Sequence, residues 1–211
     1  MRGIFNRSKP LDFSVRLLRF ARNDECKMKI GLFFGSFNPI HIGHLAIADY
    51  IYRHGGLDQI WLVVSPHNPL KEIKSLADAR KRLLGVKKAV GRNSKIKVSD
   101  IEFRLPQPSY TINTLDAFKK KYPQNKFTLI IGSDNLNLFH KWKDYRKILN
   151  NYKIYVYPRI LPLNKGRKRG LSMLLNHPGI KLFDAPLLDI SSTFIREQVK
   201  KGENVKNFLP V

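Results

Sequence analysis

From Lys29 onward, short apolar runs of strand length alternate with segments in which apolar residues recur at helical spacing. This alternation predicts an α/β fold in which helices cover both faces of a largely parallel sheet. The expected strands span 29–34, 59–65, 95–98, 126–131, 153–157 and, with a weaker pattern, 180–183. The expected helices span 44–52, 78–90, 111–121 and, in shorter form, 144–149 and 193–200.

The length of 211 residues suits one well-buried domain and is short for two. We expect this single domain to span residues 28–211, because the globular pattern begins directly after Met28. Residues 1–27 are rich in arginine and lack the continuous apolar run of a secretory signal, so we expect a non-core N-terminal extension. A short basic amphipathic helix at a membrane surface is the alternative interpretation of this segment.

The composition is that of a soluble globular protein, with 43% hydrophobic and 26% charged residues. Cys26 is the single cysteine, which excludes an intramolecular disulfide, and no paired Cys/His spacing indicates a structural zinc site. The longest apolar runs have strand length, far below the roughly 20 residues that cross a bilayer. These features predict a cytoplasmic protein without a membrane span.

The formal net charge of +23 is the unusual number in the composition. Such a field attracts nucleic acid, anionic lipid or phosphorylated small molecules, so the charge alone does not identify a partner. Lysine and arginine are spread along the whole chain, and the basic cluster Lys165–Arg169 contains no interleaved aromatic residue. This spread weakens the nucleic-acid interpretation and favours a lysine-rich surface of compositional origin.

In open parallel sheets, ligands bind beyond the carboxyl ends of the strands, near the point where the strand order reverses. The loops after Phe34, Ser65 and Ile131 are therefore the places where chemistry is expected. The first of these loops carries the sequence GSFNPIHIGH over residues 35–44 and leads directly into a helix. Glycine at its start lets the backbone approach a ligand closely, and proline stiffens the turn.

His41 and His44 stand three residues apart at the start of that helix. Free N–H groups and the helix dipole favour an anion there, and Gly43 keeps side-chain bulk away from the two imidazoles. Both rings can donate hydrogen bonds to a polyphosphate, where negative charge grows during phosphoryl transfer. The alternatives are a metal site, for which no familiar motif supplies a third ligand, and a packing or capping role.

A second candidate phosphate motif is ISSTFIR at residues 190–196. Serines ahead of a helical run can cap its first turn, which is the structural alternative. Arg196 returns to the same end of the helix as Ser192 and Thr193. Hydroxyl groups, free helix N–H groups and a guanidinium are therefore expected to form a phosphate cradle.

The middle of the chain carries PSYTINTL at residues 108–115, which leads into a helix that Ser109 or Thr111 can cap. Farther on, a strand opens into GSD at residues 132–134, and Trp142 follows. A tryptophan beside such a loop offers a flat face on which an aromatic ring can stack, while core packing is its alternative role.

GSFNPIHIGH resembles the HxGH signature of the nucleotidyltransferase superfamily, whose fold is Rossmann-like and whose histidines contact nucleotide phosphates. ISSTFIR resembles the ISSTxxR motif with which adenylyltransferases grip the β- and γ-phosphates of ATP. Cytidylyltransferases and class I aminoacyl-tRNA synthetases carry other sequences there. Over essentially residues 29–210, through PSYTxxTL followed by IGSDxLxxxxxW, the chain resembles bacterial nicotinate mononucleotide adenylyltransferases.

This resemblance implies transfer of AMP from ATP, with Mg²⁺ on the polyphosphate, to nicotinate mononucleotide, giving deamido-NAD and pyrophosphate in NAD biosynthesis. By the same resemblance, His41 and His44 are catalytic and stabilise the transition state without a covalent intermediate. The residues expected at ATP are Gly35, Ser36, Phe37, His41, His44, Gly132, Asp134, Ser191, Ser192, Thr193 and Arg196. Those expected at the mononucleotide are Asn38, Lys71, Tyr110, Thr111 and Trp142. No metal ion bound by the protein itself is expected.

The sequence departs from the family pattern in several places, and Asn113 is one of them, because it replaces a frequent aspartate. Asn38 stands where many members have aspartate, and three residues are inserted before Lys71 in the loop that matches PPHK. Nicotinamide mononucleotide or another phosphorylated acceptor is the alternative within this class. From a different class, the alternative is a nucleic-acid-binding regulator with a nucleotidyltransferase-like fold. The expected partners are ATP and the mononucleotide, without nucleic acid or membrane, and a homo-oligomer is compatible with the sequence.

Overall fold

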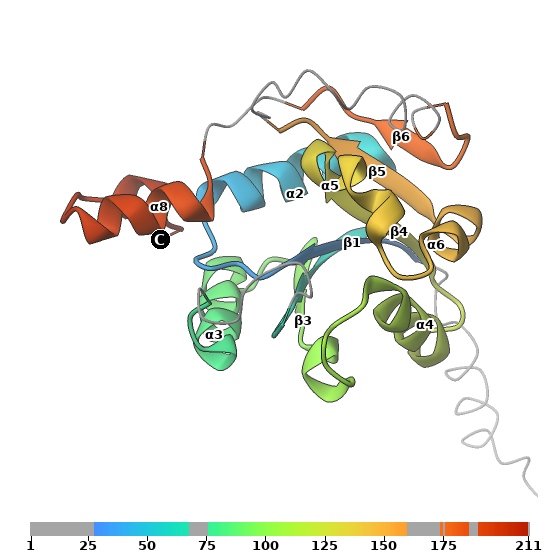
Figure 1. Ribbon diagram of the computed structural model, residues 1–211, viewed down its shortest axis with the longest axis horizontal. Coiled ribbons are helices and arrows are strands. Elements are labelled where there is room, and N and C mark those ends of the chain that lie inside the picture. The colour runs from blue at the N-terminus through green and yellow to red at the C-terminus, as the bar shows by residue number, and fades with distance from the viewer. Residues whose placement is uncertain (1–27, 68–75, 160–173, 175, 186–189, 211) are drawn as a thin grey trace, which may run out of the picture.

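The structure is a computed structural model that describes residues 28–67, 76–159, 174, 176–185 and 190–210. Within these residues, a parallel sheet lies between helices on its two faces (Figure 1). The strands are β1 Lys29–Gly35, β2 Gln59–Val64, β3 Ile96–Ser99, β4 Lys126–Gly132, β5 Lys153–Tyr157 and β6 Ile180–Leu182. The helices are α2 Ile42–Gly55, α3 Ala79–Val90, α4 Thr111–Lys121, α5 Ser133–Asn137, α6 Tyr145–Asn151 and α8 Ser192–Lys200. Short 3₁₀ helices are η2 Ile101–Arg104, η3 Phe139–Lys141 and η4 Lys206–Phe208.

The six strands lie in the order β3, β2, β1, β4, β5, β6, and each neighbouring pair is parallel. The chain first builds outward from β1 to β3 and then returns to the other side of β1 with β4, so the strand order reverses between β1 and β4. The carboxyl ends of these two strands therefore form the crevice in which such sheets bind ligands. The predicted α/β fold with a parallel sheet is confirmed.

Alternate residues of each strand point to opposite faces of the sheet, and both faces are buried. In β1, Ile30 and Leu32 pack into the core that α4, α5 and α6 cover. Phe33, from the same strand, packs into the opposite core, which α2 and α3 cover. Two apolar cores thus hold the sheet from both sides and leave its carboxyl edge for the loops.

The long helix α2 extends beyond the predicted 44–52 at both ends. Ala48 and Ile51 lie on the buried face of this helix. The helix ends at Gly56, which adopts the left-handed conformation with φ 62°. At the start of α3, the Asp78 side chain accepts a hydrogen bond from the backbone N–H of Lys81 at 2.9 Å. None of the described helices is long and apolar enough to cross a membrane.

The predicted cap of α4 is wrong. Tyr110 occupies the N-cap position and makes no side-chain capping bond, whereas Thr111 is already the first residue of the helix. The hydroxyl of Ser109 donates instead to Oε1 of Gln107 at 2.9 Å. The short elements η2, α5 and η3 were not predicted, because one turn of helix is too short to show a hydrophobic period.

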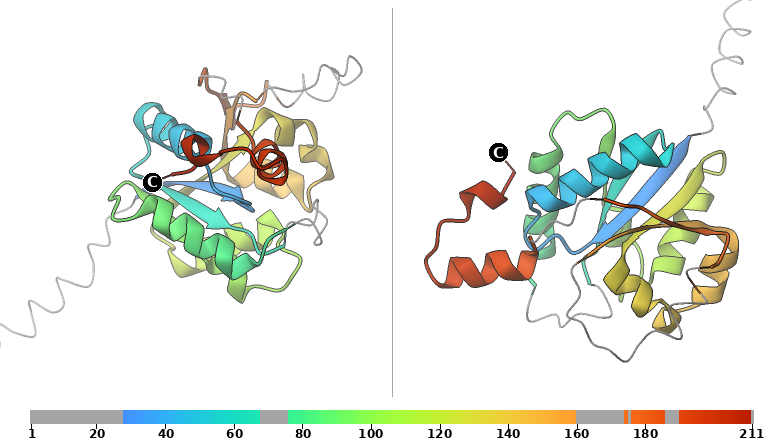
Figure 2. Two further views of the ribbon diagram at one scale, coloured as in Figure 1. Left: turned by 90° about the vertical axis from the view of Figure 1, so that its left-hand side faces the viewer. Right: turned by 90° about the horizontal axis from the view of Figure 1, so that it is seen from above.

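Helix α8 and η4 lie beyond one end of the sheet, next to the start of α2 (Figures 1 and 2). The hydroxyl of Ser192 donates to the backbone carbonyl of Pro39 at 2.9 Å, across 153 positions of sequence. The fold therefore brings the second predicted phosphate motif against the first. The extension predicted for residues 1–27 and the basic cluster at 165–169 lie outside the described residues.

Candidate functional site

A cavity of about 480 Å³ opens at the carboxyl ends of β1 and β4, a size typical of small-molecule sites. The starts of α2, α4 and α8 and the loop after β4 contribute to its wall. Every site residue predicted from the sequence lines this cavity except Lys71, which falls outside the described residues. Segments that are far apart in the sequence thus meet at the place that the strand reversal predicts.

The two histidines of the first loop lie side by side at the start of α2. His41 occupies the N-cap position, and its backbone N–H donates to Nδ1 of His44 at 3.2 Å. Their ring centroids are 3.7 Å apart. Because Nδ1 of His44 accepts this hydrogen bond, the proton of the neutral ring is assigned to Nε2, which becomes a donor. A Cβ atom at Gly43 would lie 3.0 Å from Nδ1 of His41, so glycine lets the two rings approach each other.

His41 is almost fully enclosed, with 3% of its surface exposed. Burial and the nearby positive charge of Arg159 lower the pKa of His41 from 6.5 to about 4. At neutral pH the ring is therefore uncharged in the free protein. A bound polyphosphate would oppose this shift, because an anion next to an imidazole favours its protonated form.

Phe37 shapes the loop between β1 and α2. Its backbone has φ 44°, a left-handed conformation that is strained for a bulky side chain and that is often found at functional sites. The ring is buried and packs edge-on against His44, with the centroids 5.0 Å apart. A Cβ atom at Gly35 would lie 2.8 Å from this ring. Glycine at position 35 therefore makes room for the Phe37 ring, which packs against His44, and Gly35 itself still lines the cavity.

Arg82 of α3 was not predicted, although it holds the loops of the cavity together. The side chain is only 5% exposed, and its guanidinium donates four hydrogen bonds to backbone carbonyl groups. Nη1 bonds to Ser36 at 2.5 Å and to Ser65 at 2.8 Å, Nη2 bonds to Pro66 at 2.8 Å, and Nε bonds to Ala77 at 2.9 Å. One buried cation thus joins the loop after β1, the loop after β2 and the start of α3.

The start of α8 combines a helix cap with a guanidinium, as the two interpretations of its sequence separately predicted. Oγ of Ser191 accepts a hydrogen bond from the backbone N–H of Phe194 at 3.1 Å. Nη2 of Arg196 donates to Oγ1 of Thr193 at 3.1 Å, and Nη1 donates to the backbone carbonyl of Asn38 at 2.7 Å. Arg196 therefore returns to the start of the helix, where it also contacts the first loop.

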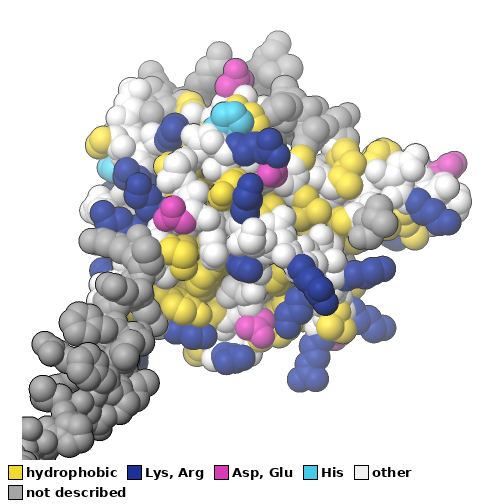
Figure 3. All heavy atoms as spheres, turned by 180° about the vertical axis from the view of Figure 1, so that it is seen from behind, with side chains coloured by type: hydrophobic (Ala, Val, Ile, Leu, Met, Phe, Trp, Pro, Cys, Tyr) yellow, Lys and Arg dark blue, Asp and Glu magenta, His cyan; other side chains and the backbone are white. Residues whose placement is uncertain are grey.

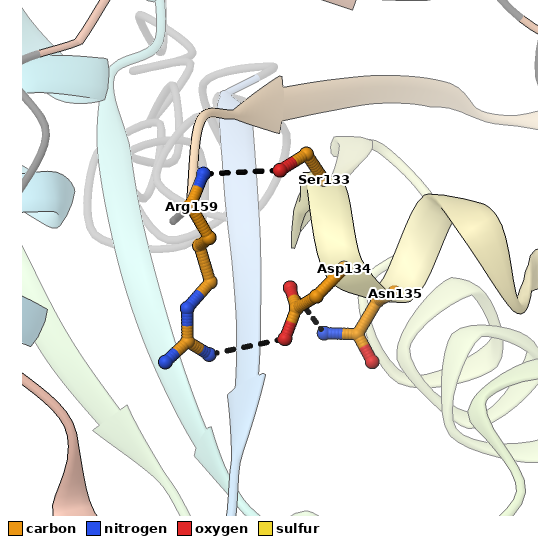
Figure 4. A network of polar contacts seen from close by, with 4 residues as sticks. All are labelled: Ser133, Asp134, Asn135 and Arg159. Atoms are coloured by element: carbon orange, nitrogen blue, oxygen red, sulfur yellow. Dashed lines mark hydrogen bonds and ion pairs between the residues drawn. The ribbon is translucent and has the colours of Figure 1, made fainter. Parts of the chain in front are cut away.

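A small polar network lies at the carboxyl end of β4 (Figure 4). Asp134 pairs with Nη1 of Arg159 at 3.2 Å and accepts a hydrogen bond from Nδ2 of Asn135 at 3.4 Å. The backbone N–H of Arg159 donates to Oγ of Ser133 at 3.0 Å. Both charged side chains are more than a third exposed, so this ion pair adds little to the stability of the fold.

Arg159 was also missed in the sequence, although a signal for it existed. It lies two residues after β5, and the rule that locates ligands beyond the carboxyl ends of strands applies to this strand as well.

Tyr110, Thr111 and Trp142 form another part of the cavity wall, together with η2. The Trp142 ring packs against the buried Phe139, with the centroids 5.3 Å apart, and still lines the cavity. Core packing of Trp142 is therefore observed, and the half-buried residue also borders the cavity, where stacking stays a prediction. Nζ of Lys143 lies 4.8 Å from the centroid of the Tyr110 ring.

Glu102 of η2 is the second buried charged residue that the sequence did not indicate. Oε1 accepts a hydrogen bond from Oγ1 of Thr114 at 2.8 Å, and 1% of the residue is exposed. Burial raises the pKa of Glu102, while the hydroxyls of Thr114, Ser65 and Ser109 act in the opposite direction. Both serines lie close enough to Glu102 to lower its pKa, although the hydroxyl of Ser109 donates to Gln107.

Within the described residues, three buried side-chain polar atoms have no hydrogen-bond partner, and all three belong to residues of this cavity. They are Nδ1 of His41, Oε2 of Glu102 and Nε1 of Trp142. Buried polar atoms in folded proteins are nearly always paired, so three unpaired ones on residues of the same cavity single it out as a candidate binding site. Among the residues described, no group of three His, Cys, Asp or Glu side chains is placed to hold a metal ion.

Comparison with known proteins agrees with this geometry. Residues 32–198 match the model of the cytidylyltransferase-like family. A probable nicotinate-nucleotide adenylyltransferase from Flavobacterium johnsoniae is 52% identical over 183 residues, which cover 87% of this chain and 92% of the relative. A relative of the same name from Bacteroides fragilis is 46% identical and covers 87% of this chain and 88% of its own.

Solved structures support the same fold. The nicotinic acid mononucleotide adenylyltransferase of Plasmodium falciparum, complexed with NaAD, has a TM-score of 0.69 at 22% sequence identity. The match covers 86% of this chain and 90% of the other. At this identity the likeness supports the architecture, and the relatives of higher identity carry the argument on activity.

Proposed function

Because the chain belongs to the cytidylyltransferase-like family, we propose that it transfers the AMP part of ATP to nicotinate mononucleotide. The products are nicotinate adenine dinucleotide and pyrophosphate, which makes the chain a nicotinate-nucleotide adenylyltransferase of NAD biosynthesis. Relatives named for this activity reach 52% identity over most of both chains. The structural observation that carries the proposal is one cavity in which the paired histidines, the start of α8 and the Tyr110–Trp142 wall meet.

The reaction needs positioning and charge stabilisation more than it needs a reactive side chain. A phosphate oxygen of the mononucleotide attacks the α-phosphorus of ATP and forms a new P–O bond. The bond between the α-phosphorus and the bridging oxygen breaks, and pyrophosphate leaves with the electron pair. His41 and His44 lie at the start of α2, where helix N–H groups also favour anions, so they are suited to stabilise the charge on the transferred group.

The proposal places the outer phosphates of ATP between the histidine pair and the start of α8. Ser191, Ser192, Thr193 and Arg196 supply hydroxyl and guanidinium donors on that side. Arg196 already donates to Asn38, so phosphate binding would use the remaining donors of the guanidinium or replace this bond. Mg²⁺ enters as part of the ATP substrate, where it neutralises the polyphosphate.

The proposal places the pyridine ring between Tyr110, Thr111 and Trp142, and the acceptor phosphate near the first loop. The flat Trp142 ring offers a stacking face, and its buried Nε1–H offers a hydrogen bond. The residues proposed to contact ATP near the adenosine and the α-phosphate are Gly35, Ser36, Phe37, Gly132 and Asp134. The residues proposed to contact the mononucleotide also include Asn38 and Lys71. We also propose that the protein is located in the cytoplasm, where ATP is available.

The surface charge favours this proposal over a nucleic-acid-binding regulator. Figure 3 shows lysine and arginine side chains scattered over one face of the molecule, with hydrophobic and acidic side chains among them. A continuous basic stripe with interleaved aromatic residues would be the footprint of a nucleic-acid site. The scattered charge is instead compatible with small, phosphorylated substrates.

The test is pyrophosphate release with Mg²⁺-ATP and each of the two mononucleotides, with mass spectrometry of the dinucleotide formed. We expect release with nicotinate mononucleotide at a higher kcat/KM than with the amide, and almost none with the His44→Ala protein. Salt-dependent binding of DNA or RNA without any pyrophosphate release would contradict the proposal and support the regulator.

A further inference from the structure

Glu102 has no role in the reaction as described above, yet the residue lines the reaction cavity with a buried carboxyl group, and only 1% of the residue is exposed. One oxygen is bound by Thr114, and Oε2 has no hydrogen-bond partner among the described residues. Burying a carboxyl group is costly unless it is paired, so a protein that keeps one at a binding cavity calls for a functional explanation.

The contact with Thr114 locates this carboxyl group relative to the acceptor. Thr111 and Thr114 are three residues apart on α4, so they lie on one face of the helix with Cβ atoms about 5–6 Å apart. Thr111 lines the cavity at the position proposed for the pyridine ring. The carboxyl group of Glu102 therefore lies about one helical turn from the position proposed for the pyridine ring.

The groups that surround Glu102 are mostly neutral. Three hydroxyl-bearing residues lie next to its carboxyl group. They are Ser65 after β2, Ser109 before α4 and Thr114 within α4. In the described part of the chain, none of the salt bridges includes Glu102. The other titratable or charged side chains on the cavity wall are His41, His44, Tyr110, Tyr157, Asp134, Lys141, Lys143, Arg159 and Arg196. Burial is the largest effect on its pKa and raises it, which favours the neutral acid.

Building on the proposed function, we propose that Glu102 is a specificity-determining residue whose own charge sets the preference between acid and amide acceptors. A neutral Glu102 accepts the negatively charged carboxylate of nicotinate mononucleotide close by. An ionised Glu102 repels that carboxylate across a poorly solvated wall, whereas the neutral amide of nicotinamide mononucleotide experiences no such repulsion. The selectivity for the acid would then decrease as Glu102 loses its proton.

Linkage gives the size and the sign of this effect. If the acceptor carboxylate raises the pKa of Glu102 by one unit, proton binding and acid binding strengthen each other tenfold. We therefore expect the ratio of kcat/KM for the acid to kcat/KM for the amide to fall roughly tenfold as pH rises through the titration of Glu102. The fall lies above the ordinary glutamate range, because the pKa is raised.

The experiment measures this ratio between about pH 5 and pH 9 for the wild-type protein, Glu102→Gln and Asp100→Asn. The ratio cancels the titration of ATP and of the acceptor phosphate, because both reactions share them. Glu102→Gln keeps the size and the Thr114 contact of a neutral acid, so its ratio is expected to stay high and constant. Asp100→Asn removes a carboxylate from the start of the same short helix, with a side chain 42% exposed, and is expected to behave like the wild-type protein.

A second measurement covers the case in which the Glu102 variant does not fold. Calorimetry of the wild-type protein in buffers of different ionisation enthalpy should show more proton uptake when the acid binds than when the amide binds. A constant wild-type ratio, the same decline in Glu102→Gln, or equal proton uptake for both ligands would overturn the inference. If neither mononucleotide yields pyrophosphate at any pH, it is the proposed function that fails.

Discussion

The end of the cavity proposed to bind phosphates (the phosphate end), formed by residues 35–44 and 190–196, differs in construction from the end proposed to bind the acceptor (the acceptor end). The acceptor end is formed by η2, the start of α4 and Trp142. At the phosphate end, the polar groups come from two continuous segments at helix starts, and they are imidazoles, hydroxyls and a guanidinium. At the acceptor end, single residues from three separate segments contribute rings, hydroxyls and a buried carboxyl group. Helix starts bind any phosphate, so that chemistry fits in a short motif, whereas discrimination between acceptors depends on packing.

The largest expected effect concerns the burial of His41 at the phosphate end. Its pKa of about 4 in the folded protein lies below the ordinary 6.5, so the unfolded chain takes up a proton first as pH falls. The associated stabilisation is complete above about pH 6.5 and is lost as pH falls toward 4, at a cost of about 3 kcal/mol. Urea unfolding at several pH values in this interval measures it.

His41→Asn should lack this loss of unfolding free energy, and His140→Asn, which alters an exposed histidine, should retain it. Equal pH dependence in His41→Asn and wild type would show that the stabilising effect of a neutral, buried His41 is absent. The acceptor end would then contain the main buried group that titrates.

His44→Ala is expected to lower kcat by at least about 100-fold, the scale for loss of one transition-state donor. Both acceptors should be slowed by the same factor, because the phosphate end treats them alike. Steady-state kinetics with each mononucleotide checks this, and an unchanged melting temperature shows that the fold is intact. His54→Ala, at an exposed position of the same helix, is the matched control. If the variant lowers kcat by different factors for the two acceptors, the phosphate end also takes part in the choice of acceptor.

Trp142→Ala should weaken both acceptors by removing a stacking face worth about 1 to 3 kcal/mol, with little change in the KM for ATP. Trp142 also packs against Phe139, so some stability is lost as well. Trp142→Phe keeps an aromatic face and is expected to recover most of the acceptor affinity. A parallel rise in the KM for ATP would mean that the tryptophan supports the whole cavity and not the acceptor end alone.

Arg196→Ala is expected to raise the KM for ATP about tenfold, the smallest of these effects, because the guanidinium is one of several donors at the start of α8. The KM for the acceptor should change less, although Arg196 also donates to Asn38. Arg196→Lys keeps the charge without the planar two-nitrogen contact and should lie in between. An unchanged KM for ATP would leave Arg196 as a clamp between α8 and the first loop.

The contrast between the two ends also explains what could be predicted from the sequence. The parallel sheet was predictable because its strands are continuous apolar runs, and the histidine pair because its residues are neighbours in a short segment. Glu102, Arg82 and Arg159 were missed for a common reason. A charged residue is normally exposed, and only the contacts with distant segments reveal that these line or support a cavity.

One local expectation was wrong. Ser109 does not cap α4, and its hydroxyl donates instead to Gln107, only two positions away. Hydroxyl, amide and carbonyl groups within a few residues of each other compete for the same hydrogen bonds, so a cap cannot be assigned from the residue type alone. The roles of the predicted site residues, Lys71 among them, and of residues 1–27 stay predictions.

The four carbonyl contacts of Arg82 bear on how this cavity can change over evolutionary time. Leu84, two positions farther along α3, is exposed, so its substitution should change the stability of the fold little. Replacement of Arg82 instead removes the hydrogen bonds that its guanidinium donates to the carbonyl groups of three segments. A lysine has three protons for four acceptors and no planar fork. If one of these loops is transferred into a related protein, it should therefore fold correctly only when that protein has an arginine at the position of α3 that matches Arg82.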